Sequence, residues 1–83
     1  MYRRLTLEEA VWEAYKEIGA ELFEHLEVPK SDLVRRYFGI FPYQPHTYRQ
    51  LAAEEQIPYT TIYYQIRTAL KELKKIIISQ YNF

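Results

Sequence analysis

Residues 47–73 read TYRQLAAEEQIPYTTIYYQIRTALKEL, and this stretch contains the pattern on which the predicted fold depends most. Thr47 is a residue type that caps helices, and it precedes a short helical pattern. A break at residues 56–58 then separates this pattern from a longer one over 59–77. Ala52 is small enough to let two helices cross closely. Two helices joined by such a short break are typical of a helix-turn-helix.

The longer segment carries apolar residues at helical spacing, which predicts one buried face. These residues are Ile62, Ile66, Ala69, Leu70, Leu73 and Ile77. In a helix-turn-helix, Ile57 would fill the turn, and Ile62 would anchor the second helix so that its opposite face stands out from the body.

The preceding half of the chain predicts two more helices. Thr6 and Glu9 form a capping-box signature, and apolar spacing continues from there to about residue 27, ending before Pro29. A short helix follows, opened by Pro29 or Ser31 and closed by Gly39, and residues 40–46 form a proline-containing loop. We therefore expect an all-α fold of four helices.

The chain has 83 residues, enough for a single domain. We divide it into an amphipathic N-terminal helix over 1–28 and a helix-turn-helix unit over 29–83. The net charge is zero, but residues 1–28 carry seven Glu against three basic residues, a net of −4, and residues 29–83 carry a net of +4. Such asymmetry points to nucleic-acid or surface binding by the basic part, or reflects ordinary surface variation.

Several classes of protein are disfavoured by composition. The absence of cysteine excludes disulfides and thiolate metal sites. His25 and His46 are isolated, and no catalytic motif or phosphate-binding loop occurs, so we expect no enzyme, no cofactor and no metal. No apolar run approaches the ~20 residues of a membrane span, and there is no signal-peptide pattern, so a cytoplasmic protein without membrane contact is expected.

The 47–73 stretch resembles region 4 of the sigma-70 family of bacterial transcription factors. The general form of that region is TxxEIAxxLGISxxTVxxxLxxALxxL. The matching positions here are Thr47, Leu51, Ala52, Ile57, Thr61, Ile62, Ile66, Ala69, Leu70 and Leu73. Residues 29–40, PKSDLVRRYFGI, resemble the helix that precedes them in the family, so the resemblance covers residues 29–75.

The chain departs from this family pattern at three places. Gln56 replaces the usual turn glycine, which costs about 1 kcal/mol if the residue is left-handed. Pro58 replaces the Ser or Thr that caps the recognition helix, so that the cap is missing or passes to Thr60. The base-reading positions, usually Arg, Glu and Gln, are hydroxyl and aromatic residues here, which favours weak or shape-led specificity.

The resemblance and the helical periodicity together predict a set of contact residues. Those expected to face DNA bases are Thr60, Thr61, Tyr63, Tyr64 and Arg67. Those expected to hold phosphates are Arg35, Arg36, Arg49 and Lys71. Hydroxyl groups and cations bind phosphates, threonine methyls touch thymine, and arginine can pair with guanine.

The sequence therefore predicts a transcription regulator or sigma-like accessory factor that binds double-stranded DNA. The resemblance also implies contact with RNA polymerase, through its β-flap. The chain has no room for the promoter-melting region of a full sigma factor, so an accessory factor, a phage- or plasmid-borne regulator or one part of a divided factor is expected. The alternative is a protein-interaction module that binds polymerase, a sigma factor or itself, with the N-terminal helix as a homodimer interface. The target site, the direction of regulation, the host and the oligomeric state are left open.

Overall fold

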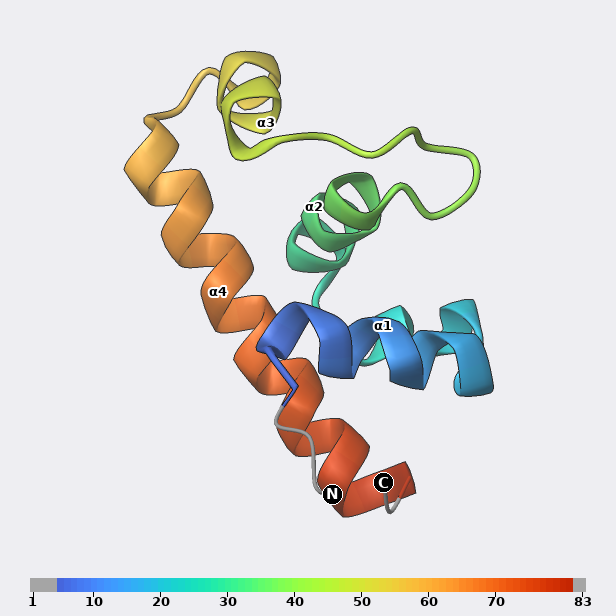
Figure 1. The fold of residues 1–83 in the computed structure, drawn as a ribbon. Coiled ribbons are helices and arrows are strands. Elements are labelled where there is room, and N and C mark those ends of the chain that lie inside the picture. Colours follow the sequence, from blue (N-terminus) through green and yellow to red (C-terminus); the bar gives the residue numbers. More distant parts are fainter. Residues whose placement is uncertain (1–4, 82–83) are drawn as a thin grey trace.

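The protein is built from helices throughout the part of the chain that the computed structural model describes, residues 5–81 (Figure 1). Four α-helices and one 3-10 helix occur there, and no strand is found among these residues. In chain order they are α1 (Leu7–Ile18), the 3-10 helix η1 (Ala20–His25), α2 (Val28–Phe38), α3 (Tyr48–Glu55) and α4 (Tyr59–Ile76), which runs into a π-helical turn, η2 (Ile77–Tyr81). The all-α prediction is confirmed.

The N-terminal segment differs from its prediction. The capping box forms as expected, because the Glu9 backbone N–H donates to Thr6 Oγ1 at 3.1 Å and the Thr6 N–H donates to Glu9 Oε1 at 3.0 Å. The helix, however, does not continue to residue 27. It ends at Ile18, because Gly19 has φ 95° and ψ −173° and turns the chain into η1. Leu22 still reaches the core from the new direction.

The α2 helix ends where the sequence indicates. Pro29 lies in its first turn, and Gly39 closes it with φ 75° and ψ 40°, the left-handed conformation that glycine adopts without strain. A Cβ atom on Gly39 would lie 2.6 Å from the ring of Pro45, so the loop also packs too closely for any side chain. The loop returns to α2 through a hydrogen bond of 2.9 Å from the His46 N–H to the Arg36 carbonyl.

Between α3 and α4 the chain makes a turn of three residues. Thr47 caps α3, as predicted. It does so in a capping box with Gln50, whose part in the cap was not predicted. Gln56 ends α3 in the left-handed region, with φ 57° and ψ 41°. Pro58 is the N-cap residue of α4 and provides no side-chain hydrogen bond, so the cap is missing and does not pass to Thr60.

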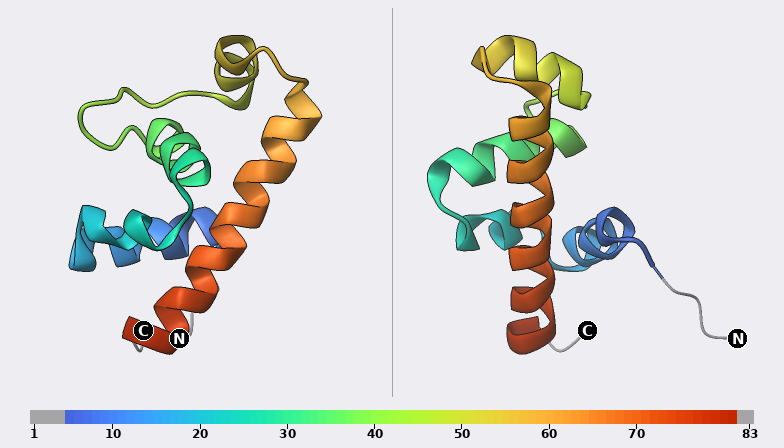
Figure 2. Two further views of the ribbon diagram at one scale, coloured as in Figure 1. Left: turned by 180° about the vertical axis from the view of Figure 1, so that it is seen from behind. Right: turned by 90° about the vertical axis from the view of Figure 1, so that its left-hand side faces the viewer.

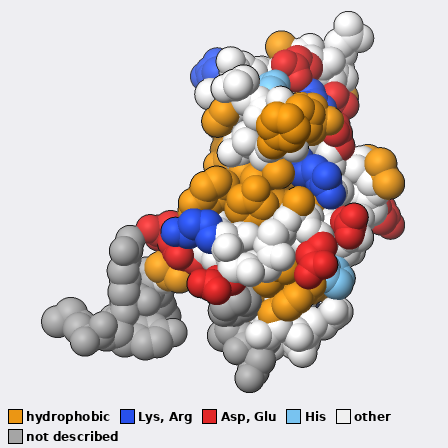
Figure 3. All heavy atoms as spheres, turned by 90° about the vertical axis from the view of Figure 1, so that its right-hand side faces the viewer, with side chains coloured by type: hydrophobic (Ala, Val, Ile, Leu, Met, Phe, Trp, Pro, Cys, Tyr) orange, Lys and Arg blue, Asp and Glu red, His pale blue; other side chains and the backbone are white. Residues whose placement is uncertain are grey.

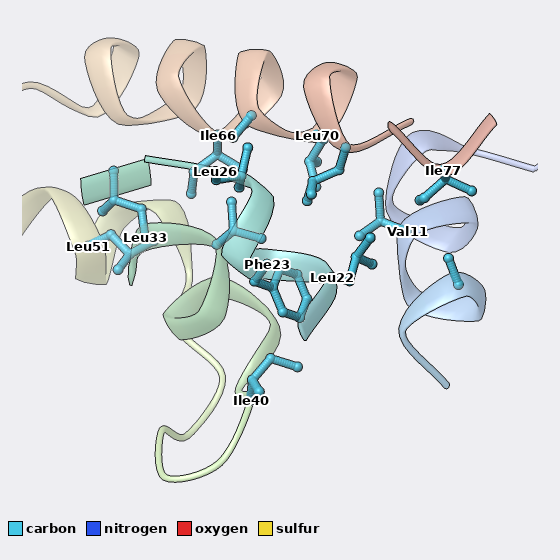
Figure 4. Packing of buried hydrophobic residues seen from close by; sticks show 14 of the residues in the cluster. Val11, Leu22, Phe23, Leu26, Leu33, Ile40, Leu51, Ile66, Leu70 and Ile77 are labelled. Carbon is cyan, nitrogen blue, oxygen red and sulfur yellow. The ribbon is translucent and has the colours of Figure 1, made fainter. Parts of the chain in front are cut away.

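The long α4 helix is the centre of the fold, and α1, α2 and α3 all pack against it (Figures 1 and 2). Its predicted apolar residues are all buried. Figure 4 shows Leu33 and Leu51 at one end of the core and Val11 and Ile77 at the other, with Phe23 between them. Because the three neighbouring helices cover one side of α4, its opposite side faces solvent.

Candidate nucleic-acid interface

The solvent-facing side of α4 forms a continuous row of polar side chains that we call the α4 outer stripe. Its members repeat every three or four residues, opposite the buried face: Thr60, Tyr64, Thr68, Lys71 and Lys75. Four of them are exposed and Thr68 is half-buried, and the Tyr64 residue keeps 71% of its surface accessible. At 1.5 Å per residue the stripe is about 22 Å long. Hydroxyl groups occupy its first half and ammonium groups its second.

Two further residues predicted to face bases lie beside this stripe. Thr61 is exposed in the first turn of α4, and Tyr63 is 46% exposed. The Tyr63 ring packs edge-on against Tyr48 of α3, with 5.2 Å between the ring centroids, and Tyr59 packs on the same ring at 5.9 Å. These contacts fix the two tyrosines while leaving part of each ring accessible.

The tyrosines are supported from below by α2. The Tyr48 ring stacks on Tyr37 at 5.0 Å with an interplanar angle of 15°. Burial, and then a hydrogen bond with Tyr48, raises the pKa of Tyr37 well above its usual value, so the Tyr37 hydroxyl stays protonated at physiological pH. At the outer edge of this group, the Arg49 guanidinium lies 5.7 Å from the Tyr59 ring centroid, within cation–π range. Arg49 is exposed, at the position where a phosphate contact was predicted.

Arg67 is not a free side chain. Its Nη1 donates to Glu8 Oε2 of α1 at 2.8 Å, and the two side chains are 28% and 34% exposed. The hydrogen bond to Glu8 is the main cause of a raised pKa for Arg67. Because 59 residues separate the two, no helical periodicity could reveal the pair.

Arg36 lies in the interior, with only 8% of its surface exposed. It forms ion pairs with Asp32 at 3.1 Å, with Glu55 at 2.8 Å and with Glu54. Burial lowers the pKa of Arg36, but the hydrogen bonds to these carboxylates outweigh that effect and raise it. The guanidinium joins α2 to α3, and we do not keep it among the candidate phosphate ligands.

Arg35 points toward another part of the molecule. Its Nε donates to Ser31 Oγ at 3.1 Å, and its guanidinium lies 6.0 Å from the Phe23 ring centroid. It lines a shallow hollow with Val28 and Tyr43, and no residue of α3 or α4 contributes to that hollow. Arg35 is therefore separated from the α4 outer stripe, and we set it aside as a phosphate ligand of that surface.

Ion pairing divides the charges of α3 and α4 in a way that the sequence did not reveal. Their three acidic residues are all bound by cations of α2: Glu54 and Glu55 by Arg36, and Glu72 by Lys30 at 2.9 Å. The basic residues Arg49, Lys71, Lys74 and Lys75, by contrast, are exposed and make no ion pair within residues 5–81. The outer side of α3 and α4 thus carries excess positive charge in a chain of zero net charge.

The two histidines make separate contacts. His25 Nε2 lies 2.8 Å from the Tyr81 hydroxyl, and His46 Nε2 lies 3.1 Å from Glu54 Oε2. Over the described part of the chain, no three His, Cys, Asp or Glu side chains are placed to hold a metal ion. None of the helices seen between residues 5 and 81 combines the length and the apolar character that a bilayer crossing requires.

No protein-family model, characterised protein or solved structure matches this chain.

Proposed function

We propose that the protein binds double-stranded DNA through a helix-turn-helix formed by α3 and α4, and that it acts as a transcription regulator or sigma-like accessory factor. The observation that carries this proposal is the α4 outer stripe. It is an exposed helix face on which hydroxyl groups are followed by lysines without an ion pair among residues 5–81, while the three carboxylates of α3 and α4 are each paired with a cation of α2. Such a face suits the major groove, which is wide enough to admit an α-helix.

The geometry of the two helices supports the proposal. The helices are joined by three residues with a left-handed Gln56, and Leu51 and Ile62 are fully buried. Ile57 is half-buried against the core at the turn. A helix-turn-helix requires these features, because the first helix must brace the second while leaving its outer face free. The positions agree with those at which the sequence resembles region 4 of the sigma-70 family.

Within this proposal the side chains divide by role. Thr60, Thr61 and Tyr64 lie near the start of α4 and would contact base edges, with Tyr63 at the side of the groove. Arg49 on α3 and the lysines of the α4 outer stripe would contact phosphates on either side. Phosphate contacts supply affinity without sequence information, whereas the base contacts supply specificity.

A protein-interaction module remains the second candidate, because large apolar side chains are also exposed outside α4. Figure 3 shows hydrophobic side chains grouped on the face of the molecule that lies on the right-hand side of Figure 1. Phe41 and Val28 are 91% and 82% exposed, and Trp12 of α1 is 38% exposed. Apolar exposure of this kind is typical of protein contacts. RNA polymerase, a sigma factor or a second copy of the chain, including a dimer through α1, are the partners this alternative proposes.

Fluorescence anisotropy of a labelled duplex at several salt concentrations tests the DNA proposal. Affinity should fall steeply with salt, and Lys71→Ala should reduce the steepness of the log–log plot by about 0.9, the loss of one phosphate contact. Lys16→Ala is the matched control, since Lys16 is an exposed lysine of α1 paired only with Glu13 among the described residues. Folded protein that binds no duplex at low salt, or equal effects of the two variants, would contradict the proposal.

A further inference from the structure

The base-facing half of α4 carries few of the charged and amide side chains that commonly read DNA bases. Residues 59–68 read YTTIYYQIRT and contain one cation, Arg67, and no carboxylate. Gln65, the one amide, is half-buried and lies off the α4 outer stripe. Guanine is most often read by an arginine whose two donors reach O6 and N7 together, so Arg67 alone could read guanine in this way.

Glu8 competes directly for that arginine. The Nη1 donor of Arg67 is engaged by the Glu8 carboxylate at 2.8 Å, and both groups are about one-third exposed or less. Moving the guanidinium toward a base would leave a partly dehydrated carboxylate without its partner, which is unfavourable. While the pair is intact, Nη1 is held by Glu8, and the fork formed by Nη1 and Nη2 cannot turn as a unit toward a guanine.

Glu8 cannot easily follow the arginine, because α1 is anchored on both sides of it. The capping box between Thr6 and Glu9 fixes the first turn, and Val11 and Ala14 are buried in the core. Glu8 is therefore held by its backbone at the place where it meets Arg67, and the pair restrains Arg67 more than it restrains α1.

We propose that Glu8 determines the base preference of this surface by holding Arg67 away from guanine, so that the preferred ligand is an A·T-rich duplex read through thymine methyl groups. This inference rests on the proposed DNA binding. With Arg67 engaged, the base-facing groups that remain exposed are Thr60, Thr61, Tyr63 and Tyr64. Threonine methyls and aromatic rings make apolar contact with the thymine C5-methyl, and hydroxyl groups bind either base pair.

Chemically modified duplexes test both parts of the inference. The first pair is an A·T-rich duplex and the same duplex with uracil in place of thymine, which removes only the methyl groups. Wild-type protein should bind the uracil duplex about two- to fourfold more weakly for each methyl contacted. The second pair is a guanine-containing duplex and its 7-deazaguanine counterpart, which lacks the N7 acceptor. Wild-type protein should not distinguish these two.

Releasing Arg67 should change the preference. Glu8→Ala should gain roughly fivefold or more for the guanine duplex relative to the A·T-rich duplex, and 7-deazaguanine should abolish the gain. Glu8→Gln, which keeps the side-chain shape, should shift the preference in the same direction. Glu13→Ala on the same helix is the matched control, because it makes the same change in charge without touching Arg67. Circular dichroism establishes that each variant is folded.

The possible outcomes distinguish a failure of the inferred base preference from a failure of the proposed DNA binding. Duplex binding with equal guanine preference in Glu8→Ala, Glu8→Gln and Glu13→Ala overturns the inference and leaves DNA binding in place. A gain that persists when Arg67→Ala is added to Glu8→Ala, or a wild-type protein that already needs guanine N7, overturns it as well. Folded wild-type protein that binds none of the duplexes overturns the inference together with the proposed function.

Discussion

The turn between α3 and α4 depends on a residue in a conformation that its side chain disfavours. Gln56 has φ 57° and ψ 41°, and the Cβ atom of an L-residue in this region costs about 1–2 kcal/mol. Glycine avoids that cost but loses more backbone entropy on folding, about 0.5–1 kcal/mol. The difference predicts that Gln56→Gly raises the free energy of unfolding by about 0.5–1 kcal/mol.

Thermal unfolding followed by circular dichroism measures this gain. For a domain of this size, 1 kcal/mol shifts Tm by roughly 4–8 °C, so an increase of about 2–8 °C is expected. Gln56→Ala keeps the Cβ atom and should leave Tm almost unchanged, which isolates the backbone effect from loss of the side chain. Ala53→Gly, at an exposed helical position three residues earlier, should instead lower stability by about 1 kcal/mol.

The opposite signs at two neighbouring positions are the decisive part of this test. If glycine at position 56 destabilised the protein, or if Gly and Ala at that position were equal, Gln56 would not be left-handed. The connection between α3 and α4 would then differ from the one described, and the support that it gives to a helix-turn-helix would be removed.

Three other predictions concern the rest of the fold. Gly39→Ala combines left-handed strain with a contact of 2.6 Å to Pro45, so urea unfolding should show a greater loss than for Gly19→Ala, whose added Cβ meets nothing within 4 Å. Arg36→Met should lower the free energy of unfolding by roughly 2 kcal/mol, less than for a fully buried ion pair because its carboxylate partners are partly hydrated. The hydrogen bond from Arg36 lowers the pKa of Glu54 in the folded protein below the ordinary value of 4.5. The stabilisation from ionised Glu54 should therefore be complete above pH 4.5 and be lost as the pH falls through the pKa of the folded protein. Glu54→Gln should flatten that part of the profile of stability against pH.

Local rules were sufficient for most of the secondary structure. The caps at Thr6 and Thr47, the end of α2 at Gly39 and the apolar face of α4 all depend on residues close together in sequence. The break at Gly19 escaped prediction because the spacing of apolar residues continues across it. Ile18 and Leu22 are four residues apart, as in one helix, although the chain has changed direction between them.

The candidate interface was predictable only in part. Helical periodicity placed Thr60, Tyr64 and Lys71 on the exposed face of α4, and the structure has them there. The same reasoning could not find the partners of Arg36 on α3 or the partner of Arg67 on α1, because these residues lie 18–59 positions away in sequence. Tertiary packing therefore decides which cations of α3 and α4 are left without an ion pair among the described residues. The DNA-binding role of these cations stays a prediction.

Amide shifts in the ¹H–¹⁵N NMR spectrum of labelled protein, titrated with a short duplex at physiological salt, report which helix contacts DNA. We expect the largest changes along residues 60–71 of α4 and at Arg49, with small changes in the loop over residues 40–46. Changes concentrated in that loop and around Trp12, or a folded protein whose spectrum does not respond to duplex, would contradict the claim that α4 is the DNA-contacting helix.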